Sequence, residues 1–154
     1  MKLFWGDIHN HCNISYGYGS LENALNAAKE HLDFCAVTGH AMWPDMPELC
    51  PETEYLISFH TNGFNKLKQN WGQVLETVNR HNKDNEFVTF HSYEMHGSAL
   101  GDYHLVSPDS NLELVYADTP KELLKKLPNQ RAIMIPHHIA YARGYRGINW
   151  EYFD

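Results

Sequence analysis

Histidine is the most suggestive residue type in this chain, with eleven copies among 154 residues. His9 and His11 are separated by one residue, and side chains with that spacing point to the same side of a strand. Neutral imidazole combined with carboxylate is a ligand set suited to Zn, Mn or Fe. Further candidate ligands are His40, Glu94, His104 and His137. The sequence therefore predicts a metal centre, provided that the fold brings these residues together.

Each candidate also has an ordinary structural explanation. His9 and His11 could cap a turn, and His40 could simply terminate a strand. Glu94 could be a surface carboxylate, and His104 could face solvent. We expect His31 and His81 to cap helices, and His60, His91 and His96 to lie at the surface or to support the ligands from behind. His138 is a weaker ligand candidate than His137, because the side chains of adjacent residues point apart.

The pattern of apolar residues predicts the elements that must position the candidates. Strands are expected at residues 3–8, 33–38, 86–92, 103–107 and 131–135, and helices at 21–32, 64–82 and 119–127. Ser20 and Thr119 are the expected helix N-caps. Pro44, Pro47 and Pro51 favour a loop over residues 41–60, and residues 140–154 are expected to be mostly loop.

This alternation of strands and helices predicts a parallel α/β sheet or barrel within one domain, residues 1–154. The carboxyl ends of parallel strands all lie on one face, and that face holds the functional site. The candidate ligands occur at or just after the ends of the expected strands, with His104 on a strand. We therefore expect them to converge on one face although they are far apart in the sequence.

Composition excludes several classes of protein. The net charge of −7 argues against a nucleic-acid-binding groove. No run of about 18 apolar residues is present, and the first residues lack the apolar segment of a signal peptide. Cys12, Cys35 and Cys50 are odd in number and form no CxxC motif, which favours a reducing compartment and hence a cytoplasmic location.

Four segments resemble motifs of the PHP (polymerase and histidinol phosphatase) superfamily. GDIHNH, residues 6–11, is similar to its first motif, and LDFCAVTGH, residues 32–40, to its second. Tyr93-Glu94 followed by His104 in YHLVS resembles the middle motifs, and IPHHIAYARGYRGINW, residues 135–150, a later one. The resemblance implies a distorted (β/α)7 barrel, two or three divalent ions and the ligand set His9, His11, His40, Glu94, His104 and His137.

The sequence also departs from the superfamily pattern. The acid or histidine expected shortly after the first motif is not evident, and Gly39 stands where the family has Asp. The family's final Asp-x-His pair and last strands would lie beyond Asp154. We therefore expect an incomplete barrel of about five strands, truncated at the carboxyl end, whose open edge could support self-association.

The resemblance implies a metal-dependent hydrolase, most simply a phosphoesterase acting on a small-molecule phosphoester. We expect His11, Glu94 and Arg146 to act in catalysis, with Arg143 or Arg146 holding a phosphoryl oxygen. Tyr16 and Tyr18 could contact a leaving group or pack within their loop. Two alternatives stay open: an amidohydrolase-type enzyme, although no Lys lies at a strand end, and a non-catalytic metal-binding module or fragment.

Overall fold

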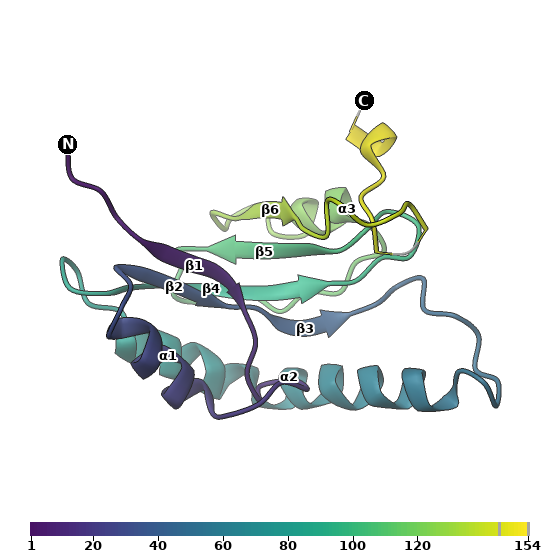
Figure 1. Cartoon of the computed structure of the whole chain (residues 1–154), viewed down its shortest axis with the longest axis horizontal. Coiled ribbons are helices and arrows are strands. Elements are labelled where there is room, and N and C mark those ends of the chain that lie inside the picture. The colour runs from purple at the N-terminus through teal and green to yellow at the C-terminus, as the bar shows by residue number, and fades with distance from the viewer. Residues whose placement is uncertain (145, 154) are drawn as a thin grey trace.

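The computed structural model describes residues 1–144 and 146–153 and contains a six-stranded sheet with the two longest helices on one side (Figure 1). The strands are β1 (Gly6–Asn10), β2 (Phe34–Val37), β3 (Gly39–Met42), β4 (Val88–Met95), β5 (Tyr103–Ser107) and β6 (Ile133–Pro136). The helices are α1 (Leu21–Lys29), α2 (Glu54–His81), α3 (Pro120–Lys125) and a 3-10 helix (Trp150–Phe153). The expected α/β class is therefore confirmed.

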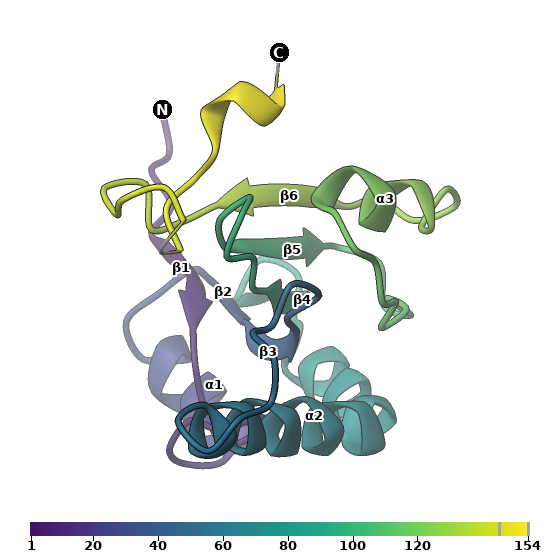
Figure 2. The ribbon, with the colours of Figure 1, turned by 90° about the vertical axis from the view of Figure 1, so that its right-hand side faces the viewer.

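The strand order is β1-β2-β4-β5-β6, and β3 pairs with the later part of β4. β1, β2, β3 and β4 run parallel where they pair, whereas β5 is antiparallel to both β4 and β6. The expectation of an all-parallel sheet is wrong for β5. Residues 96–102 join β4 to β5, and they are too few for a parallel crossover, which needs about a dozen. The sheet curls into part of a barrel (Figure 2); a closed barrel is not formed by the described residues.

Several boundaries differ from the expected ones. β1 lies later than residues 3–8, so His9 belongs to the strand instead of following it. β3 replaces the start of the expected 41–60 loop, and α2 begins at Glu54, ten residues before the expected start. All three prolines of that region precede Glu54, so none interrupts the helix. Thr53, the N-cap of α2, makes no side-chain capping bond, so this helix start is not fixed by a local cap although threonine is a common N-cap residue.

Both expected N-caps are confirmed. The Ser20 hydroxyl accepts a hydrogen bond from the Asn23 amide at 3.1 Å, and the Thr119 hydroxyl accepts one from the Glu122 amide at 3.2 Å. These bonds satisfy amide groups that have no partner inside the helix. The starting points of α1 and α3 are thus fixed by the local sequence.

The main core lies between the sheet and helices α1 and α2. Trp71 of α2 packs edge-on against Tyr93 of β4, and its indole donates a hydrogen bond to the Leu112 carbonyl at 2.8 Å. His91, also on β4, reaches Asn79 of α2 at 2.9 Å. Because side chains alternate along a strand, Phe90, Ser92 and Glu94 point to the opposite face, away from α2. His96 follows the strand, and its ring lies near His60 and Phe64 of α2. Among the described residues, no helix is long and apolar enough to cross a membrane.

Candidate metal centre

The carboxylate of Glu94 lies at the centre of a cluster of histidines. Glu94 sits near the end of β4 with only 1% of its surface exposed. One oxygen, Oε2, lies 3.4 Å from Nε2 of both His9 and His11. The other, Oε1, lies 3.1 to 3.6 Å from ring nitrogens of His137, His40 and His96. The two oxygens of one buried carboxylate therefore face different imidazoles of one continuous cluster.

The sheet register explains how His40 and His104 come to lie beside Glu94. His40 on β3 and His104 on β5 are both register partners of Glu94 on β4. Paired residues on neighbouring strands point to the same face, so both imidazoles flank the carboxylate. The sequence placed His104 correctly, although it assigned the wrong direction to its strand. The amino-terminal end of antiparallel β5 meets the carboxyl end of β4, which places His104 beside Glu94.

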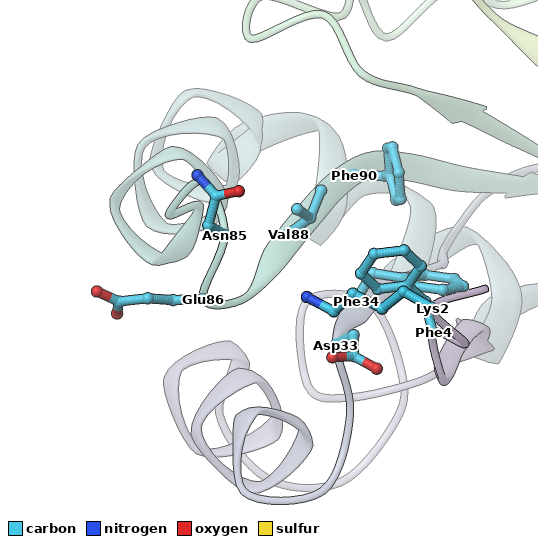
Figure 3. A pocket seen from close by; sticks show the side chains of 8 residues that line it. All are labelled: Lys2, Phe4, Asp33, Phe34, Asn85, Glu86, Val88 and Phe90. Atoms are coloured by element: carbon cyan, nitrogen blue, oxygen red, sulfur yellow. The ribbon is translucent and has the colours of Figure 1, made fainter.

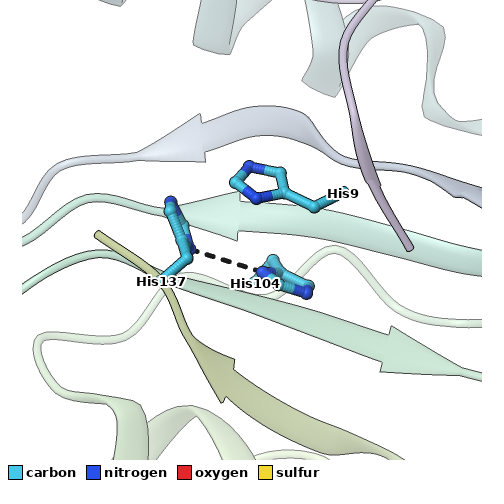
Figure 4. Close-up of side chains that lie close together, drawn as sticks. All are labelled: His9, His104 and His137. Atoms are coloured by element: carbon cyan, nitrogen blue, oxygen red, sulfur yellow. Dashed lines mark hydrogen bonds between the residues drawn. The ribbon is translucent and has the colours of Figure 1, made fainter. Parts of the chain in front are cut away.

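His9, His104 and His137 form a compact group of three rings (Figure 4). The ring centroid of His9 lies 4.8 Å from that of His104 and 4.2 Å from that of His137. Nδ1 of His104 and Nδ1 of His137 are 3.3 Å apart. With His11, His40 and Glu94, all six predicted ligands are thus brought to one region. The alternatives of a surface carboxylate for Glu94 and a solvent-facing His104 do not hold, since both are buried.

Burial sets the charges within the cluster. It lowers the pKa of His40 and His104 to about 4 and also lowers the pKa of His11, so these rings are neutral at pH 7. Burial alone would raise the pKa of Glu94, but the adjacent imidazoles of His137, His40 and His9 hold it well below its usual range. A carboxylate surrounded by neutral imidazoles with free lone pairs is the ligand set that transition-metal ions prefer.

Unpartnered polar atoms provide a separate test of whether a metal fits. Among the described residues, Glu94 Oε2, His40 Nδ1 and His104 Nε2 are buried and lack any hydrogen-bond partner. Buried polar groups in native proteins nearly always have partners, so three unpartnered polar atoms in one cluster require an explanation. Ligand atoms of these residues also fall into groups that lie within 4.8 Å of one another. The buried His, Glu and Asp groups could therefore hold metal ions.

Sequence reasoning missed Asp102 and left His96 and His138 outside the main ligand set. His96 is 3% exposed and Asp102 is 1% exposed, and His96 Nδ1 lies 3.1 Å from Asp102 Oδ2. His138 Nε2 lies 3.6 Å from the same oxygen. A signal was present, because His96 follows Glu94 by two residues and Asp102 precedes His104 by two. A spacing of two residues places side chains on one face of a strand. That spacing therefore indicated His96 beside Glu94 and Asp102 beside His104.

The two candidate arginines, Arg143 and Arg146, have different surroundings. Arg143 pairs with Glu151 at 2.8 Å. Arg146 has a left-handed backbone with φ 61°, and its carbonyl accepts a hydrogen bond from the Asp102 amide at 3.4 Å. Its side chain lines a cavity of about 210 Å³ together with His96, Asp102 and Trp43. Within residues 1–144 and 146–153 the Arg146 guanidinium forms no ion pair, which leaves it available to an anion.

The other aromatic and histidine candidates are also placed. Tyr18 is 98% exposed, whereas Tyr16 is half-buried and stacks on His40 at 4.1 Å between centroids. His31 and His81 lie at helix ends, as expected. Burial of His60, His91 and His96 excludes the surface position that was one of their expected alternatives. Within the 135–150 motif, Tyr145 lies outside the described residues, as does Asp154.

A second pocket lies away from the histidines. It occupies about 390 Å³ and is lined mainly by Phe4, Phe34, Val88 and Phe90, with Lys2 and Glu86 at its rim (Figure 3). None of the predicted ligands contributes to it. Phe90 shares a face of β4 with Glu94 but lies toward the other end of the strand, so the pocket is separate from the candidate metal ligands.

Comparison with known proteins adds no assignment. No protein-family model matches the chain, and no curated protein matches it significantly. The chemistry of the site therefore rests on the residues described above.

Proposed function

We propose that this chain is a metal-dependent phosphoesterase of the PHP type. The observation that carries the proposal is the buried Glu94 carboxylate, whose two oxygens face different imidazoles at 3.1 to 3.6 Å. That arrangement suits a carboxylate bridging two ions. The curled sheet, with the site at the carboxyl end of β4, is compatible with part of a (β/α)7-type barrel.

The proposed ligands divide between the two carboxylate oxygens. His9 and His11 would join Oε2, and His40 and His137 would join Oε1, with His104 completing the group around His9 and His137. We propose two or three ions of Zn, Mn or Fe, since imidazole and carboxylate suit all three metals. When bound, such ions supply Lewis acidity that activates water near neutral pH and offsets charge on phosphoryl oxygens.

Arg146 is the proposed anchor for the substrate. A guanidinium can hold two phosphoryl oxygens at once, and this one lines the cavity beside His96 without an ion-pair partner among the described residues. In a protein of net charge −7, a positioned cation also attracts an anionic substrate locally. The cavity of about 210 Å³ is smaller than the ~300–1,000 Å³ of typical drug-sized sites. We therefore propose a small phosphoester as substrate.

The test is metal-dependent hydrolysis by the full chain. Protein stripped with a chelator would be reloaded with Zn²⁺, Mn²⁺ or Fe²⁺ and assayed on para-nitrophenyl phosphate, with Glu94→Gln as the matched variant. We expect turnover only in the reloaded protein with Glu94 intact. Turnover of an anilide but not of the phosphoester would favour an amidohydrolase. Metal binding without turnover would favour a binding module, and absence of metal binding would contradict the proposal.

A further inference from the structure

Three side chains outside the proposed ligand set form a continuous hydrogen-bonded chain beside His40. Asp102 Oδ2 lies 3.1 Å from His96 Nδ1, and His96 Nε2 lies 2.8 Å from the Tyr16 hydroxyl. Asp102 and His96 are almost completely buried, and Tyr16 is half-buried. The chain thus runs from a fixed carboxylate to a phenol that contacts a proposed metal ligand.

The direction of each hydrogen bond follows from the carboxylate. Asp102 accepts the Gly97 amide on Oδ1 at 3.0 Å, and its Oδ2 accepts the proton of His96 Nδ1. A neutral imidazole that donates from Nδ1 carries a lone pair on Nε2, so Nε2 accepts from the Tyr16 hydroxyl. Asp102 therefore selects the tautomer of His96, and that tautomer in turn orients Tyr16.

The rings of this chain pack in parallel against His40. The Tyr16 ring lies 4.1 Å from the His40 ring at an interplanar angle of 10°, and the His96 ring lies 4.7 Å away at 9°. His11 stacks on His40 too, at 4.3 Å and 4°. These contacts restrict rotation of the His40 ring, whose Nδ1 lies 3.4 Å from Glu94 Oε1.

The fold makes a dedicated space for Tyr16. Gly63 of α2 lies so close that an added Cβ would be 2.2 Å from the Tyr16 ring. Phe59 and His60 of the same helix also contact the ring, at 4.7 and 5.2 Å between centroids. The position of Tyr16 is therefore set from one side by α2 and from the other by His96.

We infer that Tyr16, His96 and Asp102 form a positioning relay that fixes the ring of His40 for metal binding, and that His96 is not itself a ligand. This inference rests on the proposed function. The competing assignment makes His96 a third ligand beside His40 and Glu94, with which it forms a compact group. Against that assignment, Nδ1 holds the proton donated to Asp102 and Nε2 is engaged by Tyr16. Partners that orient metal ligands through hydrogen bonds typically change metal affinity by about 10–100-fold when removed.

The test is a titration of the full chain with Co²⁺, which reports both stoichiometry and ligand geometry through its visible absorption. Tyr16→Phe keeps the ring on His40 and removes only the hydroxyl. We expect an unchanged number of bound Co²⁺ ions, an affinity about 10-fold lower and an altered spectrum. Tyr18→Phe is the matched control, since Tyr18 is 98% exposed, and it should leave all three quantities unchanged. Unaltered affinity and spectrum in Tyr16→Phe would overturn the inference.

Two further variants separate positioning from ligation. His96→Gln, which can still meet the Tyr16 hydroxyl, should retain the full Co²⁺ stoichiometry and lose less affinity than His96→Ala. Loss of one Co²⁺ equivalent in His96→Gln would make His96 a ligand and overturn the relay. His9→Ala monitors the proposed function separately, because it should weaken binding whether or not the relay exists. If the wild-type chain bound no Co²⁺, the proposed function and the relay would fail together.

Discussion

The rings of His9 and His137 lie 4.2 Å apart, although His9 belongs to β1 and His137 follows β6, the two strands at opposite ends of the sheet order. A flat sheet would separate these residues by the width of the strands between them, each about 4.8 Å wide. The contact therefore depends on the curl of the whole sheet. It joins the first and last strands of the sheet at the candidate metal ligands.

Removing His9 should weaken metal binding more than removing any supporting residue. His9 lies within reach of Glu94, His11, His104 and His137, so His9→Ala removes a donor from two of the compact groups. We expect affinity to fall by at least the ~10–100-fold seen for outer partners of metal sites. Elemental analysis after gel filtration would measure the bound metal. His31→Ala serves as control because the His31 side chain is 78% exposed, and equal metal in both variants would refute the assignment.

Arg146→Ala should impair hydrolysis of a phosphoester while leaving metal content unchanged. Hydrogen bonds to charged groups contribute ~1.5–3 kcal/mol, which corresponds to a loss of about 10–100-fold in kcat/KM. Steady-state kinetics on para-nitrophenyl phosphate would measure this loss. Arg143→Ala is the comparison, since Arg143 is paired with Glu151 and should change kcat/KM little. Equal effects of the two substitutions would contradict a specific role for Arg146.

Two glycines of α2 should respond in opposite directions to alanine. Gly63→Ala places a Cβ 2.2 Å from Tyr16, and such overpacking costs ~1–3 kcal/mol of unfolding free energy. Gly72→Ala meets nothing within 4 Å and should stabilise the helix by up to ~1 kcal/mol. Urea unfolding of both variants measures the difference. A stabilised Gly63→Ala variant would show that Tyr16 is not held against α2.

The buried imidazole of His91 should make folding stability depend on pH. Burial lowers its pKa to about 4, and its Nε2 meets Asn79 on α2, well away from the proposed ligands. Between pH 6.5 and 4 the unfolded chain therefore binds a proton that the folded chain does not, so the unfolding free energy falls as pH falls through this range. His91→Gln should reduce that slope by up to ~1.4 kcal/mol per pH unit. Chemical unfolding at pH 7, 5.5 and 4.5 would reveal it; identical slopes in both proteins would exclude the effect.

Part of the convergence of the candidate ligands could be predicted from the sequence. Convergence of His9, His40 and Glu94 could be predicted because residues at the carboxyl ends of parallel strands share one face. His104 joins them for a different reason, namely its register with Glu94 across an antiparallel pair, and strand direction is decided by the length of the connection. His96 was expected at the surface or behind the ligands, although its two-residue spacing from Glu94 is compatible with a position on the same face.

The start of α2 illustrates what local sequence does not encode. Glu54 begins the helix without a side-chain cap, and its first turns are stabilised by contacts with distant segments, such as the packing of Phe59 and His60 on Tyr16. A prediction based on periodicity inside one segment has no access to those contacts. The same limit applies to β3, whose four residues pair with β4, a strand that lies far away in the sequence.

The antiparallel pairing of β4 with β5 has a consequence for how the protein folds. Glu94, His96, Asp102 and His104 lie within eleven consecutive residues of one hairpin, so their contacts close only a short loop. His9 and His11 reach the same carboxylate across more than eighty residues, and such distant contacts form slowly because closing a long loop costs more chain entropy. We expect the hairpin half of the site to assemble early and β1 to dock late. Tight metal binding would then mark the arrival of the amino-terminal strand, and a metal added to refolding protein would time that final step.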